Sequence, residues 1–136
     1  MLIYQGRINL LDREPINEGI LDYCQRQGIG FISFSPLAQG LLTDRYLHGV
    51  PDDSRMARNH FLKKERLTPE LLNYLQRLNA TATERGESLA EMALSWVLHQ
   101  QGITSVLVGA SSPEQLQKNL RSVHAQPFDE NIEAIV

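Results

Sequence analysis

The sequence contains a single cysteine, Cys24, which excludes a disulfide framework within the chain and any zinc site built on several cysteines. No apolar run approaches the ~18 residues of a membrane span. The N-terminus lacks the basic stretch and apolar core of a secretory signal. Basic residues are not in excess, because the net charge is −3 at pH 7, which argues against nucleic acid as the main partner. These absences favour a cytoplasmic protein with neither a membrane nor a nucleic-acid partner.

What is present is an ordinary globular composition, with 42% hydrophobic and 21% charged residues. The length of 136 residues suits one domain, since domains most often have about 100–150 residues. It is also about half of the ~250 residues that a (β/α)₈ barrel needs. No repeat and no break in composition divides the chain. We therefore predict that residues 1–136 form one domain or part of one.

Hydrophobic spacing and stop signals predict alternating strands and helices. Strands are expected near 2–5, 30–34 and 106–108, and helices near 16–27, 69–85, 89–101, 113–123 and from 129 onward. Residues 9–18 are expected to be mainly loop, and 35–66 form a long segment without periodicity, which is usually functional or disordered. Strands alternating with helices indicate an α/β fold with a parallel sheet.

The junction between the last strand and its helix, 108–115, is the most informative local feature. Unpaired N–H groups and a partial positive charge at a helix N-terminus favour anions. Gly109 would let a ligand approach the backbone, and the hydroxyl groups of Ser111 and Ser112 would add donors. The alternative is structural: Ser112 caps the helix, and the glycine and serines fill a tight turn. From these residues alone both interpretations stay open.

The long segment carries more cations than anions between 44 and 66, although the whole chain is acidic. Guanidinium groups match phosphate in bidentate geometry, so the arginines of this segment are candidate phosphate ligands: Arg45, Arg55, Arg58 and Arg66. A solvated loop with scattered charges explains the same composition.

No known catalytic motif and no cluster of metal ligands is evident. The histidines, His48, His60, His99 and His124, are scattered and are expected at the surface. Cys24 is expected to be a buried thiol, and Trp96 is expected to pack between a helix and the sheet. Gln5 and Phe34 each end a predicted strand, so each either contacts a ligand or belongs to the framework.

Three segments together resemble the C-terminal half of an aldo-keto reductase. Residues 34–46, F-S-P-L-A-Q-G-L-L-T-D-R-Y, resemble the family's segment after barrel strand seven. Residues 109–119 match a G-A-S-x-x-x-Q-x-x-x-N cofactor motif after strand eight, and Gln5 and Asn9 match a Q-x-x-x-N pattern after strand six. The likeness covers nearly the whole chain, and is greatest for bacterial glyceraldehyde-phosphate reductases and potassium-channel β subunits.

The resemblance implies a partial (β/α)₈ TIM barrel, strands six to eight with their helices, that binds NADPH without a Rossmann motif. It implies that Gln5 hydrogen-bonds the nicotinamide carboxamide and that Phe34 stacks on the nicotinamide ring. It implies that five residues contact the pyrophosphate: Ser35, Pro36, Leu37, Gln39 and Arg45. It implies that six residues contact the adenosine phosphate end: Arg55, Gly109, Ser111, Ser112, Gln115 and Asn119.

The sequence also departs from the family pattern. Ser112 and Lys118 stand where Arg or Asn and Glu are common, Asp44 replaces a common Gly, and Ile8 replaces a frequent Tyr. The family's catalytic Asp, Tyr, Lys and His lie on the first half of the barrel, and no position here corresponds to them.

The expected function is therefore the NADPH-binding portion of an enzyme that reduces aldehydes or ketones to alcohols. Two alternatives stay open: a stand-alone nucleotide-binding or regulatory module, and a truncated remnant without function. Open sheet edges predict association with the missing half-barrel or with other copies. The isolated chain is expected to bind NADPH weakly or not at all.

Overall fold

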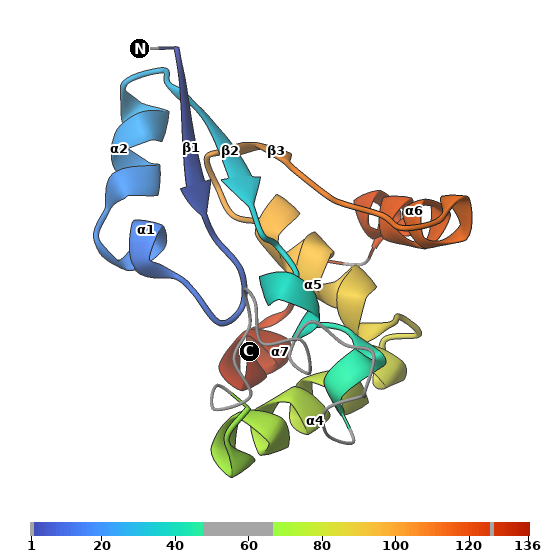
Figure 1. The fold of residues 1–136 in the computed structure, drawn as a ribbon. Coiled ribbons are helices and arrows are strands. Elements are labelled where there is room, and N and C mark those ends of the chain that lie inside the picture. The colour runs from blue at the N-terminus through green and yellow to red at the C-terminus, as the bar shows by residue number, and fades with distance from the viewer. Residues whose placement is uncertain (1, 48–66, 126) are drawn as a thin grey trace.

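The computed structural model describes residues 2–47, 67–125 and 127–136, and they contain a three-stranded parallel sheet (Figure 1). Its strands are β1 (Ile3–Arg7), β2 (Gly30–Phe34) and β3 (Ile103–Val106), in the order β1-β2-β3. Tyr4 pairs with Phe31 and Arg7 with Phe34 in the β1–β2 register. The α/β class and the parallel sheet predicted from the sequence are confirmed.

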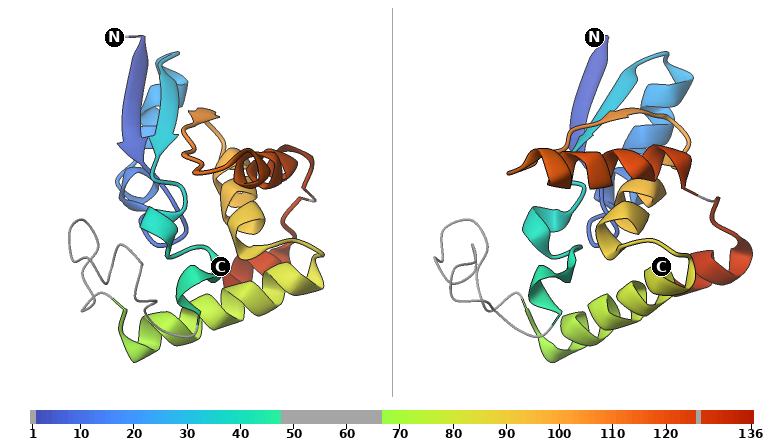
Figure 2. Two further views of the ribbon diagram at one scale, coloured as in Figure 1. Left: turned by 45° about the vertical axis from the view of Figure 1, so that its right-hand side comes forward. Right: turned by 90° about the vertical axis from the view of Figure 1, so that its right-hand side faces the viewer.

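Helices alternate with the strands as expected. They are α1 (Glu14–Asn17), α2 (Ile20–Arg26), α4 (Pro69–Glu84), α5 (Leu89–Leu98), α6 (Pro113–Leu120) and α7 (Glu130–Ile135). Short 3₁₀ turns follow at Ala38–Gly40, Asp44–Tyr46 and Arg121–His124. Figure 2 shows the sheet with α2 at one end of the molecule, α4 at the other, and α5 between them.

Four helices begin where the sequence predicts a capping side chain. Thr68, Ser88, Ser112 and Asp129 each accept a hydrogen bond from the backbone N–H three residues later, at 2.9–3.1 Å. An N-cap oxygen satisfies a donor that the helix itself leaves unpaired, which contributes about 1 kcal/mol. The starts of α4, α5, α6 and α7 are therefore fixed by local chemistry.

Three expectations about element boundaries were wrong. Residues 9–18 contain α1, and Gly19, at φ 83°, separates it from α2, so the helix predicted near 16–27 is divided. The last strand is Ile103–Val106 rather than 106–108. The apolar run at 106–108 led to that prediction. Leu107 and Val108 are nevertheless exposed, because pairing with β2 ends at this point. Leu107 N–H makes the last bond to that strand, 2.8 Å from Ser33 O.

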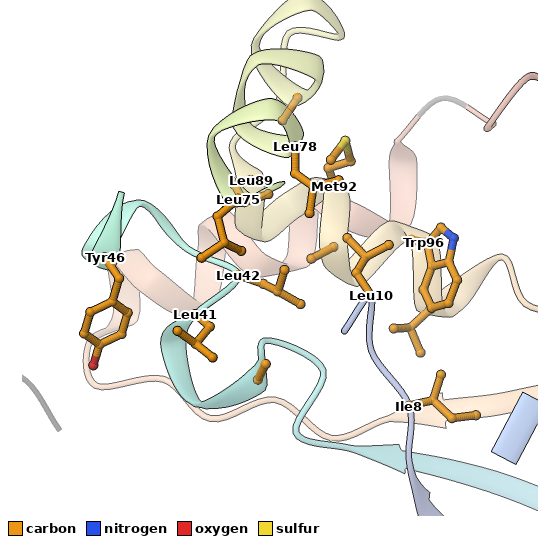
Figure 3. Close-up of a cluster of buried hydrophobic side chains, with 14 of the residues drawn as sticks. Ile8, Leu10, Leu41, Leu42, Tyr46, Leu75, Leu78, Leu89, Met92 and Trp96 are labelled. Atoms are coloured by element: carbon orange, nitrogen blue, oxygen red, sulfur yellow. The ribbon is translucent and has the colours of Figure 1, made fainter. Parts of the chain in front are cut away.

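The main core lies beyond the carboxyl end of the sheet rather than directly on it (Figure 3). Ile8 and Leu10 follow β1 in the chain, and they belong to one buried cluster with Leu41 and Leu42 from the segment after β2. Residues of α4 and α5 complete this cluster. These four side chains are at most 3% exposed. Full burial of an aliphatic side chain stabilises the folded state by about 1.5–3 kcal/mol. This cluster therefore anchors the segments that follow β1 and β2.

Candidate functional site

A cleft with a volume of about 640 Å³ lies where the segments after β2 and β3 face each other. This is the carboxyl edge of a parallel sheet, where α/β proteins place their ligands. The volume lies within the usual range for small-molecule and cofactor sites. Eight of the thirteen predicted cofactor residues line it: Ser35, Pro36, Leu37, Gln39, Arg45, Gly109, Ser111 and Gln115.

The first wall of the cleft, residues 35–45, has an unusual backbone. Ser35, Ala38 and Gln39 have φ values of 52°, 51° and 58°, in the left-handed region that favours glycine. Each such residue costs on the order of 1 kcal/mol or more, and persists only when its surroundings hold it. Backbone bonds from Ala38 N–H to Ser35 O (3.1 Å) and from Gly40 N–H to Leu37 O (3.1 Å) support this shape.

Asn9, which follows β1 and lies outside residues 35–45, also stabilises the first wall. Its Nδ2 donates to Ser35 O at 2.9 Å, and its Oδ1 accepts from the N–H groups of Leu11 and Asp12 at 2.8 and 2.9 Å. The residue is only 1% exposed. Asn9 therefore joins the segment after β1 to the segment after β2. The sequence places it in a family pattern, but nothing in the pattern shows this clamping role.

The second wall is the junction between β3 and α6. Gln115 Oε1 accepts hydrogen bonds from both the backbone N–H and the hydroxyl of Ser111, at 2.6 and 3.0 Å. Ser112 Oγ accepts from Gln115 N–H at 3.1 Å and so caps α6. The structural interpretation of Ser112 is thus confirmed, and the residue does not line the cleft. Ser111 and Gln115 do line it, with Gly109 between them and the strand.

Four further predicted residues lie outside the cleft lining or beyond the described residues. Gln5 is exposed on β1, and Phe34 is half-buried at the end of β2. Asn119, on α6, is 6% exposed, and its Nδ2 has no hydrogen-bond partner. Arg55 falls within 48–66, outside the residues that the structure describes.

A small polar hollow adjoins the cleft. It is lined by Arg7, Asn9, Ser35, Ala38 and Gln39, and its volume of about 10 Å³ is barely enough to hold one water molecule. Gln39 lines both spaces, and its Oε1 is buried without a hydrogen-bond partner. A buried acceptor without a partner costs about 1–3 kcal/mol.

Sequence reasoning missed several residues of the cleft. Thr43 and Asp44 complete the first wall, and Leu107, Val108 and Ala110 extend the second. The stretch from 107 to 111 lines the cleft without a break and overlaps the segment 108–115, whose anion site stays a prediction. Asp44 was noted only as a departure from the family pattern.

The structure gives the burial expected for the cysteine, the tryptophan and two of the histidines. Cys24 and Trp96 are buried, each 3% exposed, and Arg13 lies over the Trp96 ring at 4.6 Å. His99 and His124 are exposed, while His48 and His60 fall outside the described part. Within that part no three His, Cys, Asp or Glu residues gather as metal ligands, and no helix has the length and apolarity to cross a membrane.

A parallel sheet whose strands alternate with helices along the chain defines a protein of the α/β class. The chain belongs to the aldo/keto reductase family, whose model matches residues 1–136. Members of that family are oxidoreductases with a TIM-barrel fold that use nicotinamide cofactors. The family resemblance read from the three sequence motifs is thereby confirmed.

Individual relatives agree with this family. The chain is 48% identical over 132 residues to L-glyceraldehyde 3-phosphate reductase of Escherichia coli K12, covering 94% of this chain and 38% of that protein. It is 32% identical over 130 residues to a probable voltage-gated potassium channel subunit beta of Arabidopsis thaliana, covering 93% and 40%. A crystal structure of a thermostable aldo-keto reductase matches with a TM-score of 0.68 at 20% identity, covering 98% of this chain and 38% of that one.

The chain therefore spans about two fifths of the length of the relatives it matches. The likeness to the crystal structure shows the fold, and the described residues supply three parallel strands of it.

Proposed function

We propose that this chain forms strands six to eight of an aldo-keto reductase barrel and supplies most of the NADPH-binding cleft. The observation that carries the proposal is that two segments far apart in the sequence line the same cleft. Residues 34–46 and 109–119 resemble two of the family's cofactor segments, and residues from both line one cleft. The cleft has the size of a cofactor site, and Arg45 in its lining offers a cation.

Each part of the cofactor has candidate partners along the cleft. Ser35, Pro36, Leu37 and Gln39 would lie along the pyrophosphate, and Arg45 would balance its charge. Gly109, Ser111 and Gln115 would hold the adenosine phosphate end at the N-terminus of α6, where helix N–H groups favour anions. Ser112 would act there by capping the helix. Arg55 and Asn119 remain assigned to the same end on the sequence motif alone.

The nicotinamide end would lie toward β1 and β2, at Gln5 and Phe34. Gln5 would hydrogen-bond the carboxamide, and the Phe34 ring would stack on the nicotinamide. Bound NADPH supplies the hydride that reduces a carbonyl carbon to an alcohol. This chain's residues bind and orient the cofactor, and the proton donor of the reaction would come from the part of the barrel that carries the catalytic tetrad.

A segment exchange with the E. coli relative tests the proposal. The 38% of that reductase that this chain matches is replaced by residues 1–136, so that the remaining barrel provides the tetrad. We expect the chimera to bind NADPH and to reduce an aldehyde. A folded chimera that neither binds NADPH nor shows activity would contradict the proposed cofactor role. A chimera carrying Gln115→Ala should lose affinity for NADPH, whereas Gln27→Ala, an exposed position after α2 and away from the cleft lining, should keep it.

A stand-alone nucleotide-binding module is the second candidate function, and one observation favours it. Ile8, Leu41, Leu42 and Tyr46 are 0% exposed without any further part of a barrel. The coding DNA upstream of Met1 separates the two candidates. A half-barrel with the tetrad, in frame or frameshifted, supports an enzyme portion or its remnant, whereas a promoter and start site support the module.

A further inference from the structure

One face of the sheet carries Gln5, Arg7 and Phe34. Side chains alternate along a strand, so Gln5 and Arg7 share one face of β1, and both are exposed. In the parallel register Arg7 pairs with Phe34, which places the Phe34 side chain on the same face. The two residues proposed to hold the nicotinamide, Gln5 and Phe34, therefore share this face with a cation.

The guanidinium group of Arg7 packs on the Phe34 ring. Its Cζ lies over the ring at 5.4 Å from the centroid, which is within the ~6 Å of a cation–π interaction. The cation is attracted because the face of an aromatic ring is electron-rich. Phe34 is nevertheless only half-buried, so part of the ring stays accessible to a second planar group.

The charge of Arg7 is balanced only in part. Among the described residues, Asp12 is its ion-pair partner, and Asp12 Oδ2 lies 3.9 Å from Arg7 Nη1, beyond hydrogen-bonding distance. The Arg7 side chain is 47% exposed, and that of Asp12 is 28% exposed. A net positive field therefore remains beside the Phe34 ring.

We infer that Arg7 makes this site prefer the reduced cofactor, NADPH, over the oxidised cofactor, NADP⁺. The inference rests on the proposed function, because it places the nicotinamide on the face of Phe34 opposite Arg7. The reduced nicotinamide ring is neutral, whereas the oxidised ring carries a positive charge. A ring that already holds the Arg7 cation on one face attracts a second cation less strongly on the other, and the two cations also repel each other. Arg7 is thus a specificity-determining residue that favours entry of NADPH and release of NADP⁺.

The ratio of the dissociation constants for NADP⁺ and NADPH tests the inference. Saturation-transfer NMR on the full chain reads weak binding, and the adenine protons, which both forms share, give each constant. Attraction between Arg7 and the phosphates cancels in the ratio, because the two forms carry the same phosphates. We expect the unmodified chain to bind NADPH more tightly than NADP⁺. Arg7→Gln should reduce this preference roughly threefold to tenfold, the scale of a Coulomb interaction between unit charges near a protein surface.

Three further variants separate the charge from the structure. Arg7→Lys keeps the charge and should keep most of the preference. Asp12→Asn removes the carboxylate that partly balances Arg7, so it should increase the preference, opposite in direction to Arg7→Gln. Arg26→Gln removes a charge at the end of α2, before β2 begins, where Arg26 pairs with Asp22 at 2.9 Å, and it should leave the ratio unchanged.

Several results would overturn the inference. One is a ratio that Arg7→Gln leaves unchanged, or that Arg26→Gln changes equally. Another is an Arg7→Lys variant that behaves like Arg7→Gln, because the effect would then not depend on the charge. Binding of both forms that Arg7→Gln tightens by the same factor would mean that the nicotinamide uses the ring face that Arg7 occupies.

The proposed function and this inference fail in different ways. Binding of both forms with a ratio independent of Arg7 leaves the cofactor role standing and overturns only the inference. Where the chain alone gives no signal, equilibrium dialysis measures the same ratio in the chimera with the E. coli reductase, with and without Arg7→Gln. A folded chimera that binds neither form contradicts the proposed function, and the inference is rejected with it.

Discussion

Asn9 shows how one buried side chain can shape the wall of a cleft that it does not itself line. Its amide uses both its oxygen and its nitrogen, with two bonds to the N–H groups of Leu11 and Asp12 and one to the carbonyl of Ser35. No apolar residue can replace this combination of donor and acceptor. The position of Asn9 was evident in the sequence pattern, but its partners were not, because they depend on how two distant segments meet.

We expect Asn9→Ala to lower the free energy of unfolding by about 2 kcal/mol or more, because it leaves buried backbone groups unpaired. Urea denaturation followed by circular dichroism measures the change. The matched control is Asn73→Ala, which alters an exposed asparagine on α4 and should change stability by less than about 0.5 kcal/mol. A loss no larger for Asn9→Ala than for Asn73→Ala would contradict the clamping role.

Arg55 carries the predicted discrimination between NADPH and NADH. Its guanidinium group would grip the adenosine 2′-phosphate, which NADH lacks, in the bidentate manner typical of arginine. Arg55→Ala should therefore weaken NADPH binding about tenfold or more while leaving NADH binding unchanged. Protection from proteolysis by each cofactor, titrated separately, gives the ratio of affinities. The neighbouring Arg58→Ala is the control, and an unchanged ratio in Arg55→Ala would exclude the contact.

At the scale of elements, helix starts were the most predictable features. Thr68, Ser88, Ser112 and Asp129 act within one turn, so the sequence alone contains the interaction. The end of β3 was less predictable, because a strand extends only as far as its partner. An apolar run looks the same in the sequence whether or not pairing continues, and Leu107 and Val108 lie past the last paired residue.

The walls of the cleft could be predicted only in part, for a related reason. Motif residues such as Ser35 and Gly109 were found because their segments resemble a family. The left-handed conformations of Ala38 and Gln39 were not predicted, since neither residue type favours them. Surrounding contacts impose them, and those contacts form only in the folded chain.

The cap of α6 yields a prediction in which stability and binding change in opposite directions. Ser112→Asp preserves the capping oxygen and adds a negative charge beside the helix N-terminus, so stability should be unchanged or higher by up to about 1 kcal/mol. The same charge should repel a phosphate at the adjoining wall and weaken NADPH binding. Thermal unfolding and a cofactor titration measure the two effects.

Ser88→Asp is the matched control for that variant, because Ser88 caps α5 with the same geometry and does not line the cleft. It should show the same change in stability with no change in NADPH affinity. Equal weakening of NADPH binding by the two aspartate variants would mean that no phosphate approaches the start of α6.

On the scale of the whole molecule, the described sheet leaves β1 and β3 with one unpaired edge each. Beside β3, a set of apolar side chains is 39–62% exposed: Leu107, Val108, Leu116, Leu120 and Val123. Unpaired edges and contiguous exposed apolar residues both promote association. We therefore expect the isolated chain to self-associate in solution, or to bind the remaining part of a barrel where that part is present.

Leu120→Glu should reduce this self-association, as measured by sedimentation velocity over a range of concentrations. Tyr23→Glu is the control, because Tyr23 on α2 is equally exposed, at 55%, but lies away from this apolar set. A monomeric chain that melts cooperatively and binds NADPH with micromolar affinity would refute the expectation. In that case the stand-alone module would become the better description of the protein.

The strained first wall of the cleft has a thermodynamic consequence for ligand binding. Three left-handed, non-glycine residues are held in place by the rest of the fold, so the ordering of this wall is completed during folding rather than when a ligand arrives. Binding then avoids the entropic cost of arranging the loop. Any change that loosens the clamp at Asn9, 26 residues before Ser35, transfers that cost to the binding step. Folding stability and ligand affinity are thereby linked through a residue that does not line the large cleft.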